Sequence, residues 1–337
     1  MSDERRVIEC VPNFSEGRDM GVIKEIADAI GSCVGVKVLN VDPGEAAHRT
    51  VVTFVGEPEA VCEAAFRAVK KAAELIDMRQ HHGEHPRIGA TDVLPLVPVS
   101  GVTLEECAEM ARRLARRIAE EAHVPCYCYE AAAFKPERRN LAVCRRGEYE
   151  GLAARLACPE EAPDYGARPY DEGIARTGCT VVGARDFLIA VNFNLNTTSV
   201  PLAQAIAREV REKGCPKLGI PGGLKTVKAI GWYIEEYGIA QVSMNLTDIH
   251  VTPLHVAYDE VKRRAEAKGL QVTGTELIGL IPEHCLVEAG TYFLRKRRKS
   301  ADLPKAELIQ EAIRSMGMDD LRPFRPEEKT IPTTFTE

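Results

Sequence analysis

The order of the predicted elements constrains the fold of this chain most, because one order occurs twice. In the first half, runs rich in Val, Ile and Thr favour strands, and apolar residues at three- and four-residue spacing favour helices. The predicted strands are residues 7–11, 36–41, 50–55 and 93–99, and the predicted helices are residues 20–30 and 57–76. The first half therefore reads strand–helix–strand–strand–helix–strand.

The second half repeats this order. Its predicted strands are residues 187–194, 227–236, 240–246 and 270–273, and its predicted helices are residues 202–213 and 253–268. Such a split βαβ (ferredoxin-like) unit is an open sheet with helices on one face. We expect an α/β (α+β) protein with two such subdomains, at residues 1–180 and 181–326, followed by an extended tail at 327–337. A cleft between two subdomains is a favoured place for a small-molecule site.

Two segments depart from this regular pattern. The strand at 93–99 contains Pro95 and Pro98, and because proline cannot donate a backbone hydrogen bond, we expect an edge strand or a strained position. Residues 157–179 show little periodicity and are rich in Pro, Gly, Asp and Arg. This composition indicates a domain boundary or a functional loop.

Charge and cysteine usage exclude several classes of protein. The net charge of −6 argues against nucleic-acid binding, and neither a signal peptide nor a membrane-spanning run is present. The eleven cysteines are odd in number and form no C-x-x-C pair, which favours a cytoplasmic protein with reduced thiols. Phosphate-loop and dinucleotide motifs are absent, so we expect no nucleotide cofactor.

Histidines are concentrated in one segment. The chain has eight histidines, and His81, His82 and His85 fall within five positions. Imidazole exchanges a proton near neutrality, with an ordinary pKa of about 6.5, and it is also a common metal ligand. This segment therefore favours either proton transfer or metal binding.

The metal interpretation requires a helix that the sequence disfavours. His81-x-x-Glu84-His85 has the spacing of an inverted zinc-peptidase motif, in which both histidines share one helical face. Gly83 lies between the ligands, and Pro86 disfavours helical backbone at His85. We therefore expect a loop and general-base chemistry. A zinc hydrolase and a purely structural polar loop remain as alternatives.

Two other turns carry charged residues. The loop at 9–19 follows a strand and precedes a helix, so its backbone N–H groups could hold an anion or could simply cap that helix. The turn at 42–49 contains Asp42, His48 and Arg49. Its acid and its arginine could form a solvated pair or point into the cleft.

Several segments together resemble glutamate formimidoyltransferase, in order from residue 7 to about residue 325. They are ECVPNFSEGRD at 9–19, NVDPG and HRTVVTFVG within 40–56, HHGEHPRIGATDVLPLVPVSGV at 81–102, GARDFLIAVNFNLN at 183–196 and KAIGWYIEEYGIAQVSMNL at 228–246. In mammals this activity is the N-terminal part of the bifunctional formimidoyltransferase-cyclodeaminase. The resemblance implies two α/β subdomains, a folate-binding cleft and a homodimer. A separate chain would then carry any cyclodeaminase activity.

The resemblance also implies a reaction and a set of site residues. The reaction moves a formimidoyl group between N-formimidoyl-L-glutamate and the co-substrate tetrahydrofolate, with no metal and no nucleotide. By the family's G-E-H-P-R motif, His85 is the catalytic residue, and Glu84 could orient its imidazole. Asp42, Arg49 and Arg87 are candidate substrate-binding residues. The candidate folate-binding residues are Gly166, Ala167, Arg168, Pro169, Tyr170 and Gly178, in a loop about three residues longer here than in the family.

Some functional alternatives stay open at this point. The donor could be formimidoylglycine or 5-formyltetrahydrofolate in the same fold. The chain could also bind folate without transferase activity. The sequence does not separate glutamate from glycine as the amino-acid partner, because one cation for the side-chain carboxylate would make that difference.

Overall fold

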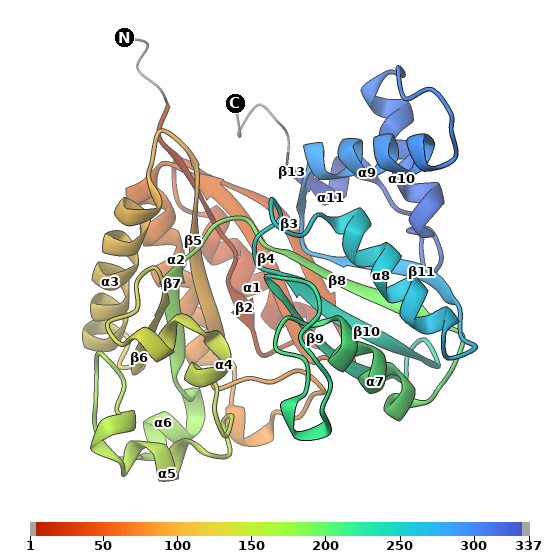
Figure 1. Cartoon of the computed structure of the whole chain (residues 1–337). Helices are drawn as coiled ribbons and strands as arrows, with labels where there is room; N and C mark the ends of the chain where they lie inside the picture. The colour runs from red at the N-terminus through yellow and green to blue at the C-terminus, as the bar shows by residue number, and fades with distance from the viewer. Residues whose placement is uncertain (1–4, 332–337) are drawn as a thin grey trace. The chain divides into compact units, whose positions relative to one another are not determined.

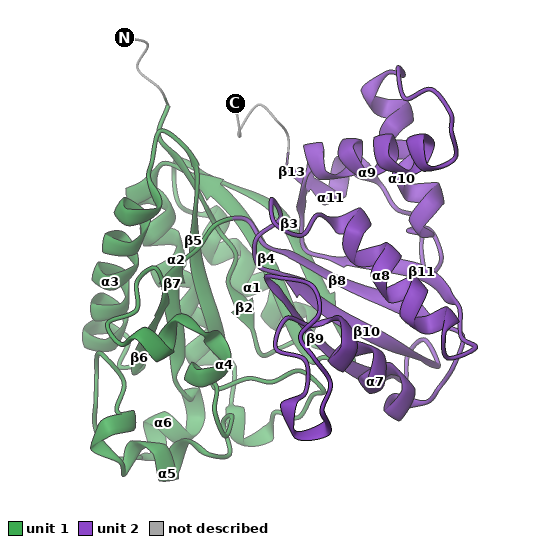
Figure 2. Ribbon diagram, viewed as in Figure 1, with its two compact units in different colours: residues 1–186 green, residues 187–337 purple. Residues whose placement is uncertain are grey.

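The structure is a computed structural model that describes residues 5–331, and its internal contacts divide the chain into two compact units (Figure 2). Unit 1 ends at Asp186, and unit 2 begins at Phe187. Each unit is built on one main sheet. No helix among the described residues is long and apolar enough to cross a bilayer.

Unit 1 contains the predicted strand–helix–strand–strand–helix–strand order (Figure 1). Its elements are β1 (Val7–Cys10), α1 (Met20–Gly31), β3 (Val36–Gly44), β4 (Arg49–Gly56), α2 (Pro58–Leu75) and β5 (Thr91–Ser100). The strands lie in the order β3-β4-β1-β5, and every pairing is antiparallel. The short strand β2 (Asn13–Phe14) continues β1 between β4 and β5. The split βαβ prediction is thus confirmed in unit 1.

Two parallel strands extend this sheet beyond β5. They are β7 (Thr180–Ala184) beside β5 and β6 (Cys126–Glu130) beside β7, and α3 (Leu104–Glu121) precedes β6. The expectation of an edge position for β5 is therefore wrong. The carbonyl oxygen of Pro95 accepts from the N–H of Val11. The missing N–H of Pro95 thus points to the break between β1 and β2, where the ladder is already interrupted.

Both faces of the β5-β7-β6 part of the sheet are covered. Leu94 and Val182 belong to the core cluster under α1–α3, whereas Val93 and Val181 belong to a second cluster on the other face. Three short helices contribute to that second cluster: α4 (Leu141–Cys144), α5 (Leu152–Leu156) and α6 (Glu172–Thr177). Because adjacent strand residues point to opposite faces, apolar residues at every position favour burial on both sides. The expectation of helices on one face alone is thus incomplete for unit 1.

Unit 2 has the same split βαβ core. It comprises β8 (Ile189–Leu195), α7 (Val200–Val210), β9 (Val227–Ile234), β10 (Ile239–Leu246), α8 (Leu254–Glu266) and β11 (Val272–Ile278). Its strands lie in the order β11-β8-β10-β9. Two further helices follow, α9 (Glu283–Lys296) and α10 (Lys305–Met316). This order confirms the prediction for the second half.

The end of the described chain is more regular than an extended tail. Residues Pro326–Lys329 form the single turn α11, and β13 (Thr330–Ile331) pairs in parallel with β12 (Ile281–Pro282). The rest of the segment expected to be a tail, residues 332–337, lies outside the described residues.

Candidate active site

The histidine-rich segment is a loop. A single 3₁₀ turn, η1 (Met78–Gln80), ends before His81, and no helix forms before β5 begins at Thr91. His81 and His85 therefore do not lie one above the other on a helical face, which the zinc interpretation requires. Among residues 5–331, no group of three or more His, Cys, Asp or Glu side chains is arranged to hold a metal ion.

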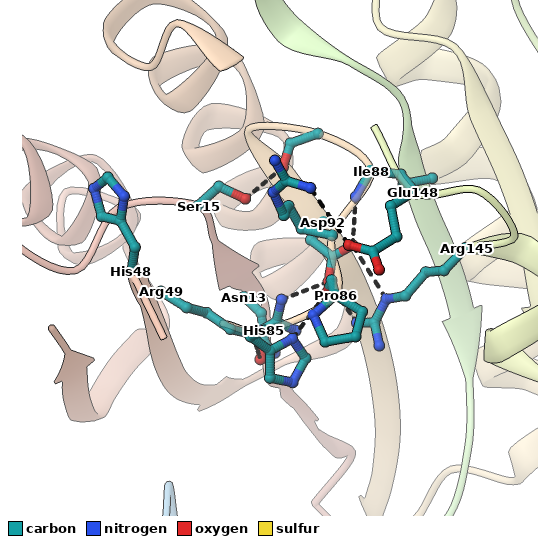
Figure 3. A network of polar contacts seen from close by, with 12 residues as sticks. Asn13, Ser15, His48, Arg49, His85, Pro86, Ile88, Asp92, Arg145 and Glu148 are labelled. Carbon is teal, nitrogen blue, oxygen red and sulfur yellow. Dashed lines mark hydrogen bonds and ion pairs between the residues drawn. The ribbon is translucent and has the colours of Figure 1, made fainter. Parts of the chain in front are cut away.

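A buried carboxylate organises this loop and its surroundings (Figure 3). Asp92, near the start of β5, is fully buried. Its Oδ2 accepts from Nη1 of Arg49 at 2.5 Å and from Nη2 of Arg145. Its Oδ1 accepts from Nε of Arg145 at 3.2 Å and from the backbone N–H of Ile88 at 3.0 Å. One carboxylate thus holds two guanidinium groups and the loop backbone.

Arg49 is the first residue of β4, and its side chain is fixed from two sides. Nδ2 of Asn13 donates to the carbonyl oxygen of Val11 at 2.9 Å, so Oδ1 of Asn13 is turned towards Arg49. That Oδ1 accepts from Nε of Arg49 at 2.9 Å. With Nη1 bound to Asp92, the guanidinium has a single orientation.

Arg145 reaches Asp92 from the segment that covers the second face of the sheet. It directly follows α4, whose Cys144 is buried in the second core cluster. Nη1 of Arg155 donates to the carbonyl oxygen of Cys144 at 2.7 Å, which fixes the backbone just before Arg145. Arg145 keeps 13% of its side-chain surface exposed, whereas Asp92 keeps none.

Burial and the charges of this cluster together set the protonation of His85. Burial alone would raise the pKa of Asp92, but Arg145 and Arg49 outweigh it and hold that pKa at about 2. Burial lowers the pKa of Arg49 to about 10, so both partners are charged at neutral pH. Burial, then the positive charges of Arg49 and Arg145, lower the pKa of His85 well below its ordinary value. His85 is therefore neutral near pH 7.

The neighbouring backbone selects one tautomer of His85. Nδ1 lies 2.8 Å from the carbonyl oxygen of Pro86 (Figure 3). A carbonyl oxygen only accepts, so Nδ1 carries the proton and donates it. The lone pair of the neutral ring is then on Nε2, the atom that can act as a base.

His48 and His81 connect the loop to the turn between β3 and β4. The rings of His48 and His81 stack with centroids 4.2 Å apart. Nε2 of His81 donates to the carbonyl oxygen of His48 at 2.7 Å, and Nδ1 of His48 donates to the carbonyl oxygen of His82 at 2.9 Å. Nε2 of His48 lies 3.1 Å from the carboxylate of Glu16. A Cβ at Gly83 would overlap the carbonyl oxygen of Ala47, so the two segments are in close contact.

Arg87 is occupied within the loop. Its Nε donates to Nδ1 of His81 at 3.2 Å, and its two Nη groups bind the carboxylate of Glu150 at 2.8 and 2.6 Å. Glu148 lies 3.4 Å away on the same guanidinium. These contacts fit a residue that supports the loop, whereas a substrate-binding residue needs a guanidinium edge that a ligand can reach.

Two other predicted residues, Glu84 and Asp42, differ in their exposure to solvent. The side chain of Glu84 is exposed, and among the described contacts its carboxylate does not bond to His85. The carbonyl oxygen of Pro86 orients the imidazole instead. Asp42 is buried on β3 opposite Val51, so its carboxylate lies on the same sheet face as Arg49.

The predicted folate segment reaches the loop at only one end. Gly178 is buried and forms a bridge with Gly89, and the N–H of Cys179 donates to the carbonyl oxygen of Ile88 at 2.9 Å. The other end is elsewhere, because Arg168 donates to the carbonyl oxygen of His123 at 2.9 Å, just after α3. Gly166, Ala167, Pro169 and Tyr170 are exposed.

Sequence reasoning missed Asp92, Arg145 and Glu16 as parts of this site. Asp92 carried a usable signal, because a charged residue inside a run of buried apolar residues is usually paired. No signal in the sequence distinguishes Arg145, because the neighbouring Arg146 has the same side chain and is exposed.

Comparisons with known proteins cover both units. The N-terminal subdomain of the formiminotransferase domain matches residues 7–185, and the formiminotransferase domain matches residues 190–335. A glutamate formimidoyltransferase from Streptococcus pyogenes serotype M1 is 41% identical over 290 residues, which cover 86% of this chain and 94% of that protein. The protein of the same name from Thermoplasma acidophilum is 40% identical, covering 86% and 92%.

Longer relatives match as well. A formimidoyltransferase-cyclodeaminase from Gallus gallus is 46% identical over 326 residues, which cover 97% of this chain and 59% of that protein. The chain thus spans about three fifths of the length of that relative.

Proposed function

The chain belongs to the formiminotransferase family, and from this membership we propose that it transfers a formimidoyl group between N-formimidoyl-L-glutamate and tetrahydrofolate. The products are 5-formimidoyltetrahydrofolate and L-glutamate. Tetrahydrofolate is a co-substrate here. Formimidoylglycine and 5-formyltetrahydrofolate are the competing donors.

The protonation state and orientation of His85 are the observation that supports this proposal. His85 is neutral beside two arginines, and its Nδ1 donates to Pro86, so Nε2 holds a lone pair. A neutral imidazole in a fixed orientation is the general base that attack by an amine requires. General acid–base catalysis of this kind contributes about 10²–10⁴ in rate.

The proposed steps return the proton they remove. N5 of tetrahydrofolate attacks the formimidoyl carbon, a C–N bond forms, and Nε2 of His85 takes the proton from N5. The tetrahedral intermediate then collapses with cleavage of the bond to the glutamate nitrogen, and His85 gives its proton to that leaving amine. Holding two substrates together supplies part of the acceleration.

The remaining assignments are proposals at a finer level. Segment 166–178 binds folate, with Gly178 nearest to the catalytic loop. Asp42 and Arg49 contact substrate. The predicted roles of Glu84 in orienting His85 and of Arg87 in binding substrate stay predictions, and the contacts of Arg87 favour a supporting role in the loop instead. We also propose a cytoplasmic homodimer. The eleven unpaired thiols support a reducing compartment.

The experiment that tests the proposal measures turnover with defined donors. Purified protein is incubated with tetrahydrofolate and either formimidoylglutamate or formimidoylglycine, and separately with 5-formyltetrahydrofolate and L-glutamate. With the formimidoyl donors, acid converts any 5-formimidoyl product to methenyltetrahydrofolate, which is detected by its absorbance. With the formyl donor, glutamate is the acceptor and formylglutamate is assayed.

His85→Ala runs beside the wild type, with circular dichroism to verify folding. We expect turnover with formimidoylglutamate and a loss of about 10²–10⁴ in the variant. Folded wild-type protein that binds folate and turns over no donor contradicts the proposal.

A further inference from the structure

The buried cluster at Asp92 has more positive than negative charge. Arg49 and Arg145 each carry one positive charge, and Asp92 carries one negative charge. Both oxygens of Asp92 already accept two hydrogen bonds each. Asp92 therefore holds the two guanidinium groups in place but cannot neutralise both of them.

The two carboxylates that follow Arg145 most closely in the chain are bound to a different arginine. Glu148 and Glu150 pair with Arg87, and their side chains are 43% and 60% exposed. His81, on the other side of Arg87, accepts from it as a neutral ring. The excess charge at Arg49 and Arg145 is thus not balanced by the carboxylates of this neighbouring group.

Burying an excess of positive charge is costly unless a further anion joins it. Asn13 and Asp92 occupy Nε and Nη1 of Arg49, while Asp92 occupies Nε and Nη2 of Arg145. Each arginine has further N–H groups, and a guanidinium matches a carboxylate with two parallel hydrogen bonds. The partial exposure of Arg145 gives such a ligand a way in.

We propose that Arg145 and Arg49 together form a carboxylate-binding site for the amino-acid donor, with Asp92 as the residue that positions both. This inference rests on the proposed transfer reaction. It assigns a binding role to Arg145, which the sequence did not single out, and it gives Arg87 a supporting role in the loop.

The position of the cluster favours the α-carboxylate of the donor over the other available carboxylates. The α-carboxylate is attached to the carbon that bears the leaving nitrogen, so a donor placed for proton transfer from His85 has that carboxylate close by. The glutamyl tail of folate is separated from N5 by an aromatic ring and an amide. Both sources share the same chemistry, and the test must separate them.

The test measures KM for each substrate in three variants. Arg145→Gln removes the charge, Arg145→Lys keeps it, and Arg146→Gln is the matched control, because Arg146 is 62% exposed and pairs with Glu161. Losing a charged hydrogen bond weakens binding about tenfold to a hundredfold. We expect the KM of formimidoylglutamate to rise by that factor in Arg145→Gln, less in Arg145→Lys, and not in Arg146→Gln.

Two further arms separate the sources of the carboxylate: the first uses the wild type alone, and the second uses the wild type and Arg145→Gln. Formimidoylglycine is compared with N-formimidoylmethylamine, which lacks the α-carboxylate, and tetrahydrofolate is compared with tetrahydropteroate, which lacks the glutamyl tail. We expect the loss of the α-carboxylate to raise the donor KM, and we expect tetrahydropteroate to respond to Arg145→Gln as tetrahydrofolate does.

Several results overturn the inference. One is an unchanged donor KM in folded Arg145→Gln, and another is a rise in the KM of tetrahydrofolate that tetrahydropteroate does not share. Calorimetry with L-glutamate alone gives a readout that does not depend on turnover. Wild-type protein that binds L-glutamate but turns over no donor contradicts the proposed function, whereas equal glutamate binding by wild type and Arg145→Gln contradicts the inference alone.

Discussion

Arg145 donates to both carboxylate oxygens of Asp92, although 53 positions separate the two residues. This pair joins β5, which belongs to the split βαβ core, to α4, which covers the second face of the extended sheet. The same carboxylate accepts from the backbone of Ile88, three residues after His85. The loop that contains the candidate base is therefore fixed by a contact that forms only when the extension folds onto the core.

Asp92→Asn is expected to destabilise the protein strongly. It leaves two guanidinium groups without their shared negative charge, and breaking a buried pair in this way costs about 3–5 kcal/mol. Asp28→Asn is the matched control, because Asp28 pairs with Lys24 on an exposed helical face. Such surface pairs contribute about 0–1 kcal/mol. Urea unfolding of both variants measures the difference, and similar losses in the two variants would contradict the prediction.

The protein is expected to become less stable as the pH falls, because the pKa of His81 is lower in the folded state than in the unfolded state. Its folded pKa is about 4, mainly because of burial, while an unfolded histidine has a pKa of about 6.5. Above pH 6.5 the ring is neutral in both states. As pH falls towards 4 the unfolded state takes up a proton that the folded state does not, so the free energy of unfolding decreases.

The contribution of His81 is isolated by comparing variants. His81→Gln keeps a donor for the carbonyl oxygen of His48 and an acceptor for Arg87, but it does not titrate. Urea unfolding between pH 7 and pH 4 is expected to show a steeper loss in the wild type than in the variant, by at most about 3 kcal/mol. If the free energy of unfolding falls equally with pH in the two proteins, His81 has the same pKa in the folded and unfolded states, which contradicts the prediction.

Removing His48 is expected to slow the reaction without abolishing substrate binding. His48 bridges Glu16 and the carbonyl oxygen of His82, so its loss frees the loop before His85. A misplacement of 1 Å can cost about 100-fold in rate, and we expect kcat to fall by about tenfold to 100-fold in His48→Ala, with a smaller change in KM.

A control and a rescue variant make this test specific to the bridge. His82→Ala leaves the bridge intact, because His48 binds only the backbone of His82, and its kcat should match the wild type. His48→Asn tolerates the left-handed backbone at this position, where φ is 47°, and its amide can donate to His82 in place of Nδ1. Equal losses of kcat in His48→Ala and His82→Ala would show that the bridge made by His48 does not position the loop.

The fold was predictable where the sequence has strong periodicity. Both strand–helix–strand–strand–helix–strand units follow from local patterns, as does the loop at His81–His85, because Gly83 and Pro86 exclude a helix. The interior position of β5 was not predictable. Pro95 is tolerated there because it faces the break between β1 and β2, and that relation depends on the tertiary pairing of three strands.

The site was predictable only in part, because its central contacts are long-range. His85 and Arg49 could be singled out from their local segments, whereas Arg145 gains its role from the folding of α4 onto the sheet. Arg87 shows the opposite case. Its sequence context suggests a ligand for a carboxylate, but Glu150, 63 positions later, already binds its guanidinium.

Gly178 provides a test of how the extension supports the catalytic loop. Its φ is 65°, and a Cβ there would overlap the carbonyl oxygen of Ile88 and the backbone of Gly89. Gly238, in the turn between β9 and β10, has the same φ of 65° but open space around it. The two glycines therefore separate the cost of left-handed backbone from the cost of the close approach.

Gly238→Ala is expected to lose about 1–2 kcal/mol, the cost of placing an alanine in left-handed backbone. Gly178→Ala pays the same cost and about 1–3 kcal/mol more, because Ile88 and Gly89 must move away from the new methyl group. Since Ile88 lies three residues after His85 and donates to Asp92, this displacement should also lower kcat in Gly178→Ala and leave it unchanged in Gly238→Ala. Urea unfolding and steady-state kinetics on both variants measure the two effects, and an equal loss of stability with unchanged kcat would mean that the segment ending at Gly178 does not hold the catalytic loop in place.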